Sequence, residues 1–305
     1  MSYSETKAIT WIELAIIAKA SEVEHWESWL LSIGAEAVTL CDAADQPIYE
    51  LMPGETAWWD YTEVKGLFPA TVQAKTLVAQ LEASCSSEPL PTYTIHCIVD
   101  EDWSQEWLKY VKPVHIQSHF WVVAPALRSE ISDPQAQILL LEPGLAFGTG
   151  SHPTTQLCLK ALFQYQEYFH HKTVIDYGCG SGILGLTALK LGANRILAID
   201  ISEQALAATQ QNGSLNNFDT NCIDLILPEN LTLQANSDLL VANILANPLI
   251  ELATRFQQLL KPGGLLILSG LLGLDKSRVI AAYTPNFKLV NEYQADEWLC
   301  LVFKL

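Results

Sequence analysis

A glycine-rich turn at residues 178–182 is the part of this chain whose residue types and spacing best suit ligand chemistry. An apolar run at 173–177 predicts a strand before the turn, and Ile183 begins a predicted helix after it. Glycine permits positive φ and a close approach of the backbone to a ligand, and the first turn of a helix presents free N–H groups. We therefore expect a nucleoside or a phosphate to bind above this turn.

Two classes of cofactor are held by such a turn. The spacing Gly180-x-Gly182-x-x-Gly185 fits the fingerprint of nicotinamide dinucleotide domains. The run from Asp176 through Gly178 to Gly180 resembles motif I of the seven-stranded S-adenosylmethionine (SAM)-dependent methyltransferases, and a carboxylate suits a cationic cofactor better than a pyrophosphate. A turn without any ligand is the third alternative, which repeated glycines disfavour because they weaken a turn that only connects two elements.

A second acid follows at the end of the next predicted strand, residues 195–200. Asp200 lies about 20 residues beyond the first glycine of the turn, where cofactor domains of either class hold the ribose hydroxyls. Asp200 therefore predicts a bound nucleoside without choosing between the two classes.

A second glycine-rich segment, 144–155, precedes a helix predicted at about 156–168. Its residues suited to ligand contact are Phe147, Gly148, Thr149, Gly150 and Thr155. Glycines beside an aromatic ring let a loop fold over a ligand, and threonine hydroxyls cap helices. His152 is a candidate base in the same loop. No acid or nucleophile at triad-like spacing supports that role, so a structural loop histidine is favoured.

An asparagine ends the strand predicted at 238–243, which is apolar until Asn243, as buried parallel strands are. Ligands of open α/β sheets bind at the carboxyl ends of strands, so we expect Asn243 on the same edge as the glycine turn. Amino-group methyltransferases carry Asn/Asp-Pro-Pro-Tyr at this place, whereas this chain has Asn243-Ile244-Leu245-Ala246. The aromatic stacking partner is missing, and Phe147 is the candidate substitute. Asn243 is our candidate acceptor for a substrate amine, and an asparagine that only caps the next helix is the alternative.

Two segments, Gly148-Thr149-Gly150-Ser151-His152-Pro153-Thr154-Thr155 and 174–182, together resemble the ribosomal protein L11 methyltransferase family. Asp102, Trp103, Trp107 and residues 241–246 extend the similarity. The cofactor contacts that the resemblance implies are Thr155, Gly178, Asp200 and Asn243, with Phe147, Gly148, Thr149, Gly150, Asp176 and Gly180 around them.

The resemblance also implies a reaction, in which methyl groups pass from SAM to lysine side chains and to the N-terminal amine of ribosomal protein L11. S-adenosylhomocysteine is the second product, no metal is needed, and the substrate is expected as the free protein before ribosome assembly. Two alternatives stay open. One is an N-methyltransferase acting on another protein or a small amine, and the other is a non-catalytic SAM-binding scaffold.

The predicted elements give an α/β architecture of two domains. Residues 1–99 follow the order β-α-β-β-α-β of a small ferredoxin-like domain, which we expect to recognise the substrate. A linker helix is expected at 100–115. Residues 116–305 form the predicted seven-stranded class I SAM methyltransferase domain, which is Rossmann-like.

Two local patterns refine this architecture. Segments 287–290 and 298–303 are spaced as a closing antiparallel pair, which the methyltransferase fold has and the usual nicotinamide domain lacks. This pair favours SAM as the cofactor. In the first domain, Ser21 and Glu24 have the spacing of a capping box and predict the start of a helix that runs to about Leu31.

The chain has 305 residues and a net charge of −17, with most of the acidic excess in residues 1–112. This charge argues against nucleic acid as a direct partner, and it suits either a solvated surface or a docking face for a basic protein. No apolar run reaches the roughly 20 residues that span a bilayer, and no signal peptide begins the chain, so we expect a cytoplasmic protein without membrane contact. We also expect a monomer, although the sequence carries no direct signal of oligomeric state. Seven cysteines without a C-x-x-C pair predict free thiols and no metal site.

Overall fold

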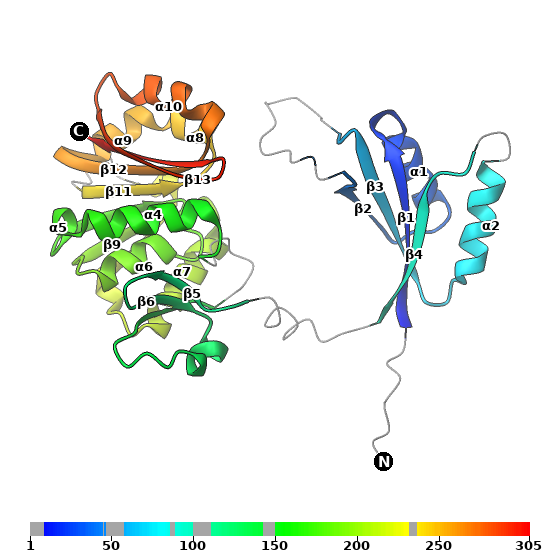
Figure 1. The fold of residues 1–305 in the computed structure, drawn as a ribbon, viewed down its shortest axis with the longest axis horizontal. Helices are drawn as coiled ribbons and strands as arrows, with labels where there is room; N and C mark the ends of the chain where they lie inside the picture. The colour runs from blue at the N-terminus through cyan, green and yellow to red at the C-terminus, as the bar shows by residue number, and fades with distance from the viewer. Residues whose placement is uncertain are drawn as a thin grey trace, which may run out of the picture. The chain divides into compact units, whose positions relative to one another are not determined.

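The computed structural model divides into two compact units, Met1–Trp107 and Leu108–Leu305. It describes residues 9–44, 46, 58–85, 89–99, 111–142, 150–231 and 237–305. Figure 1 shows the fold within each unit. Residues 100–110 of the predicted linker helix lie outside the described residues.

The N-terminal unit is a four-stranded antiparallel sheet with two helices. Its elements are β1 (Ile9–Lys19), α1 (Val23–Ser32), β2 (Ala37–Asp42), β3 (Tyr61–Pro69), α2 (Ala74–Ser84) and β4 (Tyr93–Val99). The strand order is β2-β3-β1-β4 with antiparallel neighbours, which is the predicted ferredoxin-like arrangement. Leu14 and Ile16 of β1 share one core with Trp26 of α1 and Leu77 of α2, so both helices cover the same face of the sheet.

The C-terminal unit contains a small sheet and a large one. The small sheet has the order β5-β6-β7 and is formed by β5 (Val114–Gln117), β6 (Phe120–Val123) and β7 (Gln137–Leu140). The large sheet is formed by β8 (Thr173–Tyr177), β9 (Arg195–Ile199), β10 (Ile223–Ile226), β11 (Ser237–Asn243), β12 (Leu260–Leu272), β13 (Lys288–Ala295) and β14 (Trp298–Lys304).

The large sheet has the strand order β10-β9-β8-β11-β12-β14-β13. Strands β8 to β12 are parallel, whereas β14 runs antiparallel to both β12 and β13. The predicted seven-stranded sheet with a closing antiparallel pair is therefore confirmed.

Helices cover both faces of the large sheet. They are α4 (Pro153–Gln164), α5 (Gln166–Phe169), α6 (Ile183–Lys190), α7 (Glu203–Leu215), α8 (Ala246–Glu251), α9 (Ala253–Leu259) and α10 (Lys276–Tyr283). Val174 and Leu239 pack with α4 and α6, whereas their neighbours Ile175 and Leu240 pack with α8, α9 and α10. The ribbon in Figure 1 shows these two groups of helices on the two sides of the sheet. Strands buried on both faces give the continuous apolar runs seen in the sequence. None of the helices in the described ranges is long and apolar enough to cross a membrane.

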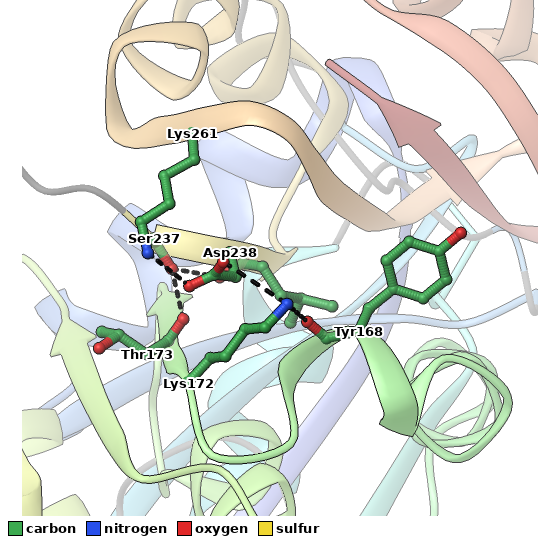
Figure 2. A network of polar contacts seen from close by, with 7 residues as sticks. Tyr168, Lys172, Thr173, Ser237, Asp238 and Lys261 are labelled. Carbon is green, nitrogen blue, oxygen red and sulfur yellow. Dashed lines mark hydrogen bonds and ion pairs between the residues drawn. The ribbon is translucent and has the colours of Figure 1, made fainter.

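A polar network joins the amino ends of β8 and β11 (Figure 2). The carboxylate of Asp238 lies 2.8 Å from the Nζ atom of Lys261 and 3.7 Å from that of Lys172. The hydroxyl of Ser237 donates to the backbone carbonyl of Thr173 at 2.8 Å. These contacts fix the register of β8 against β11. They thereby also set the relative positions of the carboxyl ends of the two strands.

Candidate active site

A cavity of about 530 Å³ opens at the carboxyl ends of the parallel strands. Gly178 and Gly180 after β8, Asp200 after β9, and Asn243 at the end of β11 all line it, together with Thr155 of α4. Its size lies in the range of pockets for small-molecule ligands. The fold thus brings five of the predicted site residues, distant in sequence, to one place.

The turn between β8 and α6 requires its glycines. Gly178, Gly180 and Gly182 have φ values of 77°, 53° and 80°, in the left-handed region that favours glycine. A Cβ atom on Gly178 would also lie closer than 3.0 Å to the side chain of Ile244. The turn therefore offers bare backbone to a ligand.

Asp200 is held in place by two backbone N–H groups. Its Oδ2 atom accepts the N–H of Gly180, and its Oδ1 atom accepts the N–H of Ser202, both at 3.0 Å. Each carboxylate oxygen keeps a further lone pair. A half-buried acid oriented in this way can accept the two hydroxyls of a ribose.

Asp176 does not line the cavity. Its side chain is only 1% exposed, and its Oδ2 atom accepts the N–H of Gly185 at 2.8 Å, which ties the first turn of α6 to β8. Its Oδ1 atom is buried and has no hydrogen-bond partner among the described residues. Burial raises the pKa of Asp176 to about 7, and the charge of Asp200 acts in the same direction. The sequence predicted a contact between Asp176 and a cationic cofactor. In the structure, Asp176 instead lies buried beneath the glycine turn, where it supports α6.

The side chain of Asn243 is oriented by α4. Its Nδ2 atom donates to Oγ1 of Thr154 at 3.2 Å and to Oγ1 of Thr155 at 3.3 Å. Both threonines are almost fully buried. With the nitrogen engaged by the two hydroxyls, the Oδ1 atom of Asn243 is the acceptor left for a ligand.

His152 caps the start of α4. Its Nδ1 atom accepts the backbone N–H of Thr154 at 3.3 Å and lies 2.7 Å from Oγ1 of the same residue. The imidazole also packs edge-on against Trp298, with 5.0 Å between ring centroids. The predicted structural role of His152 agrees with these contacts.

The charge of the cavity is negative. Among the described residues that line it, the charged ones are Asp200 and Glu251, and none is a lysine or arginine. A pyrophosphate would be repelled there, whereas a sulfonium would be attracted. In the described part of the chain, no three His, Cys, Asp or Glu side chains gather as metal ligands.

Some predicted residues fall elsewhere. Phe147, Gly148 and Thr149 lie outside the described residues. Gly150 has φ 87°, and a Cβ atom on it would meet Ile183 at 3.1 Å, so its role here is a close approach to α6.

The structure adds residues that the sequence did not single out. Ile201 follows Asp200 and is 87% exposed although it is aliphatic, and Leu245, 44% exposed, follows Asn243 and Ile244. Both line the cavity, as does Glu251. Ile201 and Leu245 could have been predicted from the sequence, because each is an apolar residue that comes just beyond a polar residue at the end of a strand.

Together, the sheet order with its closing antiparallel pair, the glycine turn and the acid-lined cavity define a class I SAM-dependent methyltransferase. The sequence model of the family described as "Ribosomal protein L11 methyltransferase (PrmA)" matches residues 10–305. The chain belongs to this ribosomal protein L11 methyltransferase family.

Two relatives match 95% of this chain, and a solved structure matches 63% of it. A protein of Teredinibacter turnerae named ribosomal protein L11 methyltransferase is 42% identical over 291 residues, which cover 95% of each chain. One of Marinobacter nauticus with the same name is 41% identical over 294 residues, covering 95% of this chain and 97% of its own. A solved structure titled as ribosomal protein L11 methylase from Lactobacillus delbrueckii subsp. bulgaricus is 32% identical, with a TM-score of 0.57 over 63% of this chain and 98% of its own.

Proposed function

We propose that this chain transfers methyl groups from SAM to lysine side chains and to the N-terminal amine of ribosomal protein L11. Family membership over residues 10–305 supports the substrate. The observation that carries the chemistry is the Asn243 amide, whose nitrogen is engaged by Thr154 and Thr155 while its oxygen is left at the edge of an acidic cavity.

The residues of the cavity fit SAM. Gly178 and Gly180 supply a backbone floor without side chains, and the carboxylate of Asp200 suits ribose hydroxyls. The hydroxyl of Thr155 accepts from Asn243 and, among the described residues, its hydrogen has no acceptor, so it can donate to the ligand. The exposed side chain of Ile201 offers an apolar face for the adenine ring. When bound, SAM supplies an electrophilic methyl group on a sulfonium.

Asn243 orients the attacking amine. A lysine side chain has an ordinary pKa near 10.4, and the reaction needs its neutral form. The apolar side chains of Ile244 and Leu245 beside Asn243 disfavour the charged form of the amine, so an amine that enters neutral stays neutral in the site. The Oδ1 atom of Asn243 then accepts one amine N–H and directs the nitrogen lone pair toward the methyl group. Asparagine is no strong base, so the proton leaves to water before the amine enters.

The N-terminal unit recognises the substrate in this proposal. Most of the acidic excess of the chain lies in residues 1–112. An acidic surface supports docking of a basic ribosomal protein and disfavours docking on RNA, so the free protein, in the cytoplasm, is the proposed substrate for a monomeric enzyme.

Intact-protein mass spectrometry tests the proposal directly. Purified ribosomal protein L11 is incubated with SAM and either the wild-type enzyme or its Asp200→Ala variant. We expect mass steps of one methyl group each with the wild type and far slower steps with the variant. An unmodified ribosomal protein, with SAM still bound by the enzyme, would reject the substrate and leave the methyltransferase class intact.

A further inference from the structure

A chain of three side chains links the start of α4 to the end of β11. The Nδ1 atom of His152 lies 2.7 Å from Oγ1 of Thr154, and Oγ1 of Thr154 lies 3.2 Å from Nδ2 of Asn243. Thr154 is 2% exposed, so its hydroxyl has little access to water. The direction of each hydrogen bond in the chain can be worked out from the hydrogens available.

His152 is the acceptor at the start of this chain. The backbone N–H of Thr154 points to Nδ1 of His152 at 3.3 Å, so Nδ1 acts as an acceptor, and the ring hydrogen is placed on Nε2. One hydrogen must lie between Nδ1 and Oγ1 at their separation of 2.7 Å, because two lone pairs would otherwise face each other. That hydrogen comes from Thr154.

The hydroxyl of Thr154 therefore has no second hydrogen to give to Asn243. It can only accept, so Asn243 must turn its Nδ2 atom toward Thr154 and its Oδ1 atom away. Thr155 alone would not decide the orientation, since its hydroxyl can donate or accept.

We propose that His152 is a positioning residue for methyl transfer: by accepting the hydroxyl hydrogen of Thr154, it fixes the amide of Asn243 with the oxygen toward the incoming amine. This inference rests on the proposed function, in which that oxygen accepts the amine N–H. Without the acceptor at residue 152, the Thr154 hydroxyl can donate to Asn243, the amide can rotate, and its NH₂ group would face the amine.

Two variants of His152 separate this role from general packing. His152→Ala removes the acceptor, whereas His152→Asn keeps a side-chain oxygen close to the position of Nδ1 and remains a good helix cap. Asp219→Ala is the matched control, because Asp219 caps a short turn at residues 220–222 by accepting the N–H of Asn221 at 2.9 Å.

Kinetics with ribosomal protein L11 provide the first readout. We expect His152→Ala to lower kcat about tenfold, the equivalent of 1.36 kcal/mol, with KM for the protein and the SAM affinity nearly unchanged. His152→Asn should restore most of the lost kcat, and Asp219→Ala should keep the wild-type value. If both His152 variants are equally slow, the ring itself is needed and the inference is wrong. It is also wrong if His152→Ala keeps the wild-type kcat.

The side-chain amide signals of Asn243, measured by NMR on ¹⁵N-labelled enzyme and assigned with Asn243→Asp, provide a readout that needs no activity. Slow hydrogen exchange of this NH₂ group is expected in the wild type and in His152→Asn, and faster exchange in His152→Ala. Equal exchange in all three proteins would overturn the inference. If the wild type shows the expected exchange but methylates no ribosomal protein L11, the proposed function fails and the hydrogen-bond chain stands.

Discussion

The carboxylate of Asp200 holds the backbone of Gly180, with Oδ2 accepting the Gly180 N–H at 3.0 Å. The acid that follows β9 and the glycine turn that follows β8 are thus bound to each other before any ligand arrives. A second hydrogen bond, from the N–H of Ser202, fixes the other carboxylate oxygen. The cavity floor is preorganised, so its parts need little reordering when a nucleoside binds.

Replacing Asp200 by alanine should weaken SAM binding by roughly 1.5 to 3 kcal/mol, the range for a hydrogen bond to a charged group. Isothermal calorimetry measures this loss. Asp224→Ala is the control, because it removes an acid from the neighbouring strand β10 that pairs with Arg195 at the surface, outside the cavity lining. Unchanged SAM affinity in Asp200→Ala would remove this residue from the cofactor site.

Shortening Ile201 to alanine should weaken SAM binding by about 1 kcal/mol, because the apolar surface that the adenine ring covers becomes smaller. Leu274 offers the matched comparison, since it is 78% exposed but does not line the cavity. Calorimetry measures the SAM affinity of Ile201→Ala and of Leu274→Ala, and we expect only the first to bind SAM more weakly than the wild type. An equal affinity in the two variants would contradict a contact between Ile201 and the cofactor.

The stability of the fold should depend on the proton of Asp176. Burial raises the pKa of this carboxyl from 3.8 to about 7, so between these values the folded state keeps a proton that the unfolded chain has lost. The free energy of unfolding therefore falls as pH rises through this window, by an amount of the order of 4 kcal/mol. Asp176→Asn should match the wild type near pH 4 and exceed it at pH 8.

Urea unfolding at both pH values measures the effect of Asp176. Asp133→Asn is the control, because its pH dependence should have the opposite sign. A hydrogen bond from His119 lowers the pKa of Asp133, so the stabilisation that Asp133 gives the folded state is lost as pH falls. A constant difference between wild type and Asp176→Asn across the pH range would show that Asp176 has an ordinary pKa.

Gly270→Ala should slow methyl transfer although residue 270 does not line the cavity. Gly270 has φ 83°, and a Cβ atom there would lie closer than 3.0 Å to the backbone of Ile244, the residue after Asn243. Gly263→Ala is a close control, since Gly263 has φ 80° but nothing within 4 Å of the added atom. Both variants lose stability from backbone strain, but only Gly270→Ala should displace Asn243 and lower kcat. Equal kcat values in the two variants would refute this coupling.

Salt should slow the encounter with the substrate. The acidic side chains within residues 1–112 should attract a basic protein less strongly as ionic strength rises. We therefore expect kcat/KM for ribosomal protein L11 to fall with added salt, whereas kcat changes little. Initial rates over a series of salt concentrations measure both constants. A salt-independent kcat/KM would leave the acidic excess without a role in docking.

The parallel core of the fold was predictable because its strands are buried on both faces and read as apolar runs, as at β11, predicted at 238–243 and found at Ser237–Asn243. The small sheet was harder to predict, because its strands have four residues each and show too little periodicity. The capping box predicted at Ser21 and Glu24 is wrong. The Glu22 carboxylate instead accepts the N–H of Lys19 at 3.1 Å, and α1 begins at Val23.

The predicted site residues were found by residue type at strand ends, a local signal. The burial of Asp176 and the need for glycine at position 270 depend on packing against distant segments, which no local pattern records. The orientation of Asn243 likewise depends on hydroxyls from α4, so its partners could be recognised only after folding brought the two elements together.

The order of strands in the large sheet also constrains how the enzyme is made. Strand β14 lies between β12 and β13, although it follows both along the chain. Until residues 298–304 have left the ribosome, the edge of β12 in the growing polypeptide stays exposed. Over the same time, β13 has no neighbouring strand to pair with. The four strands of the N-terminal unit, all earlier than Asp100, pair among themselves and can be complete long before. The catalytic unit thus cannot complete its large sheet until β14 has been made, when the other unit has had time to fold.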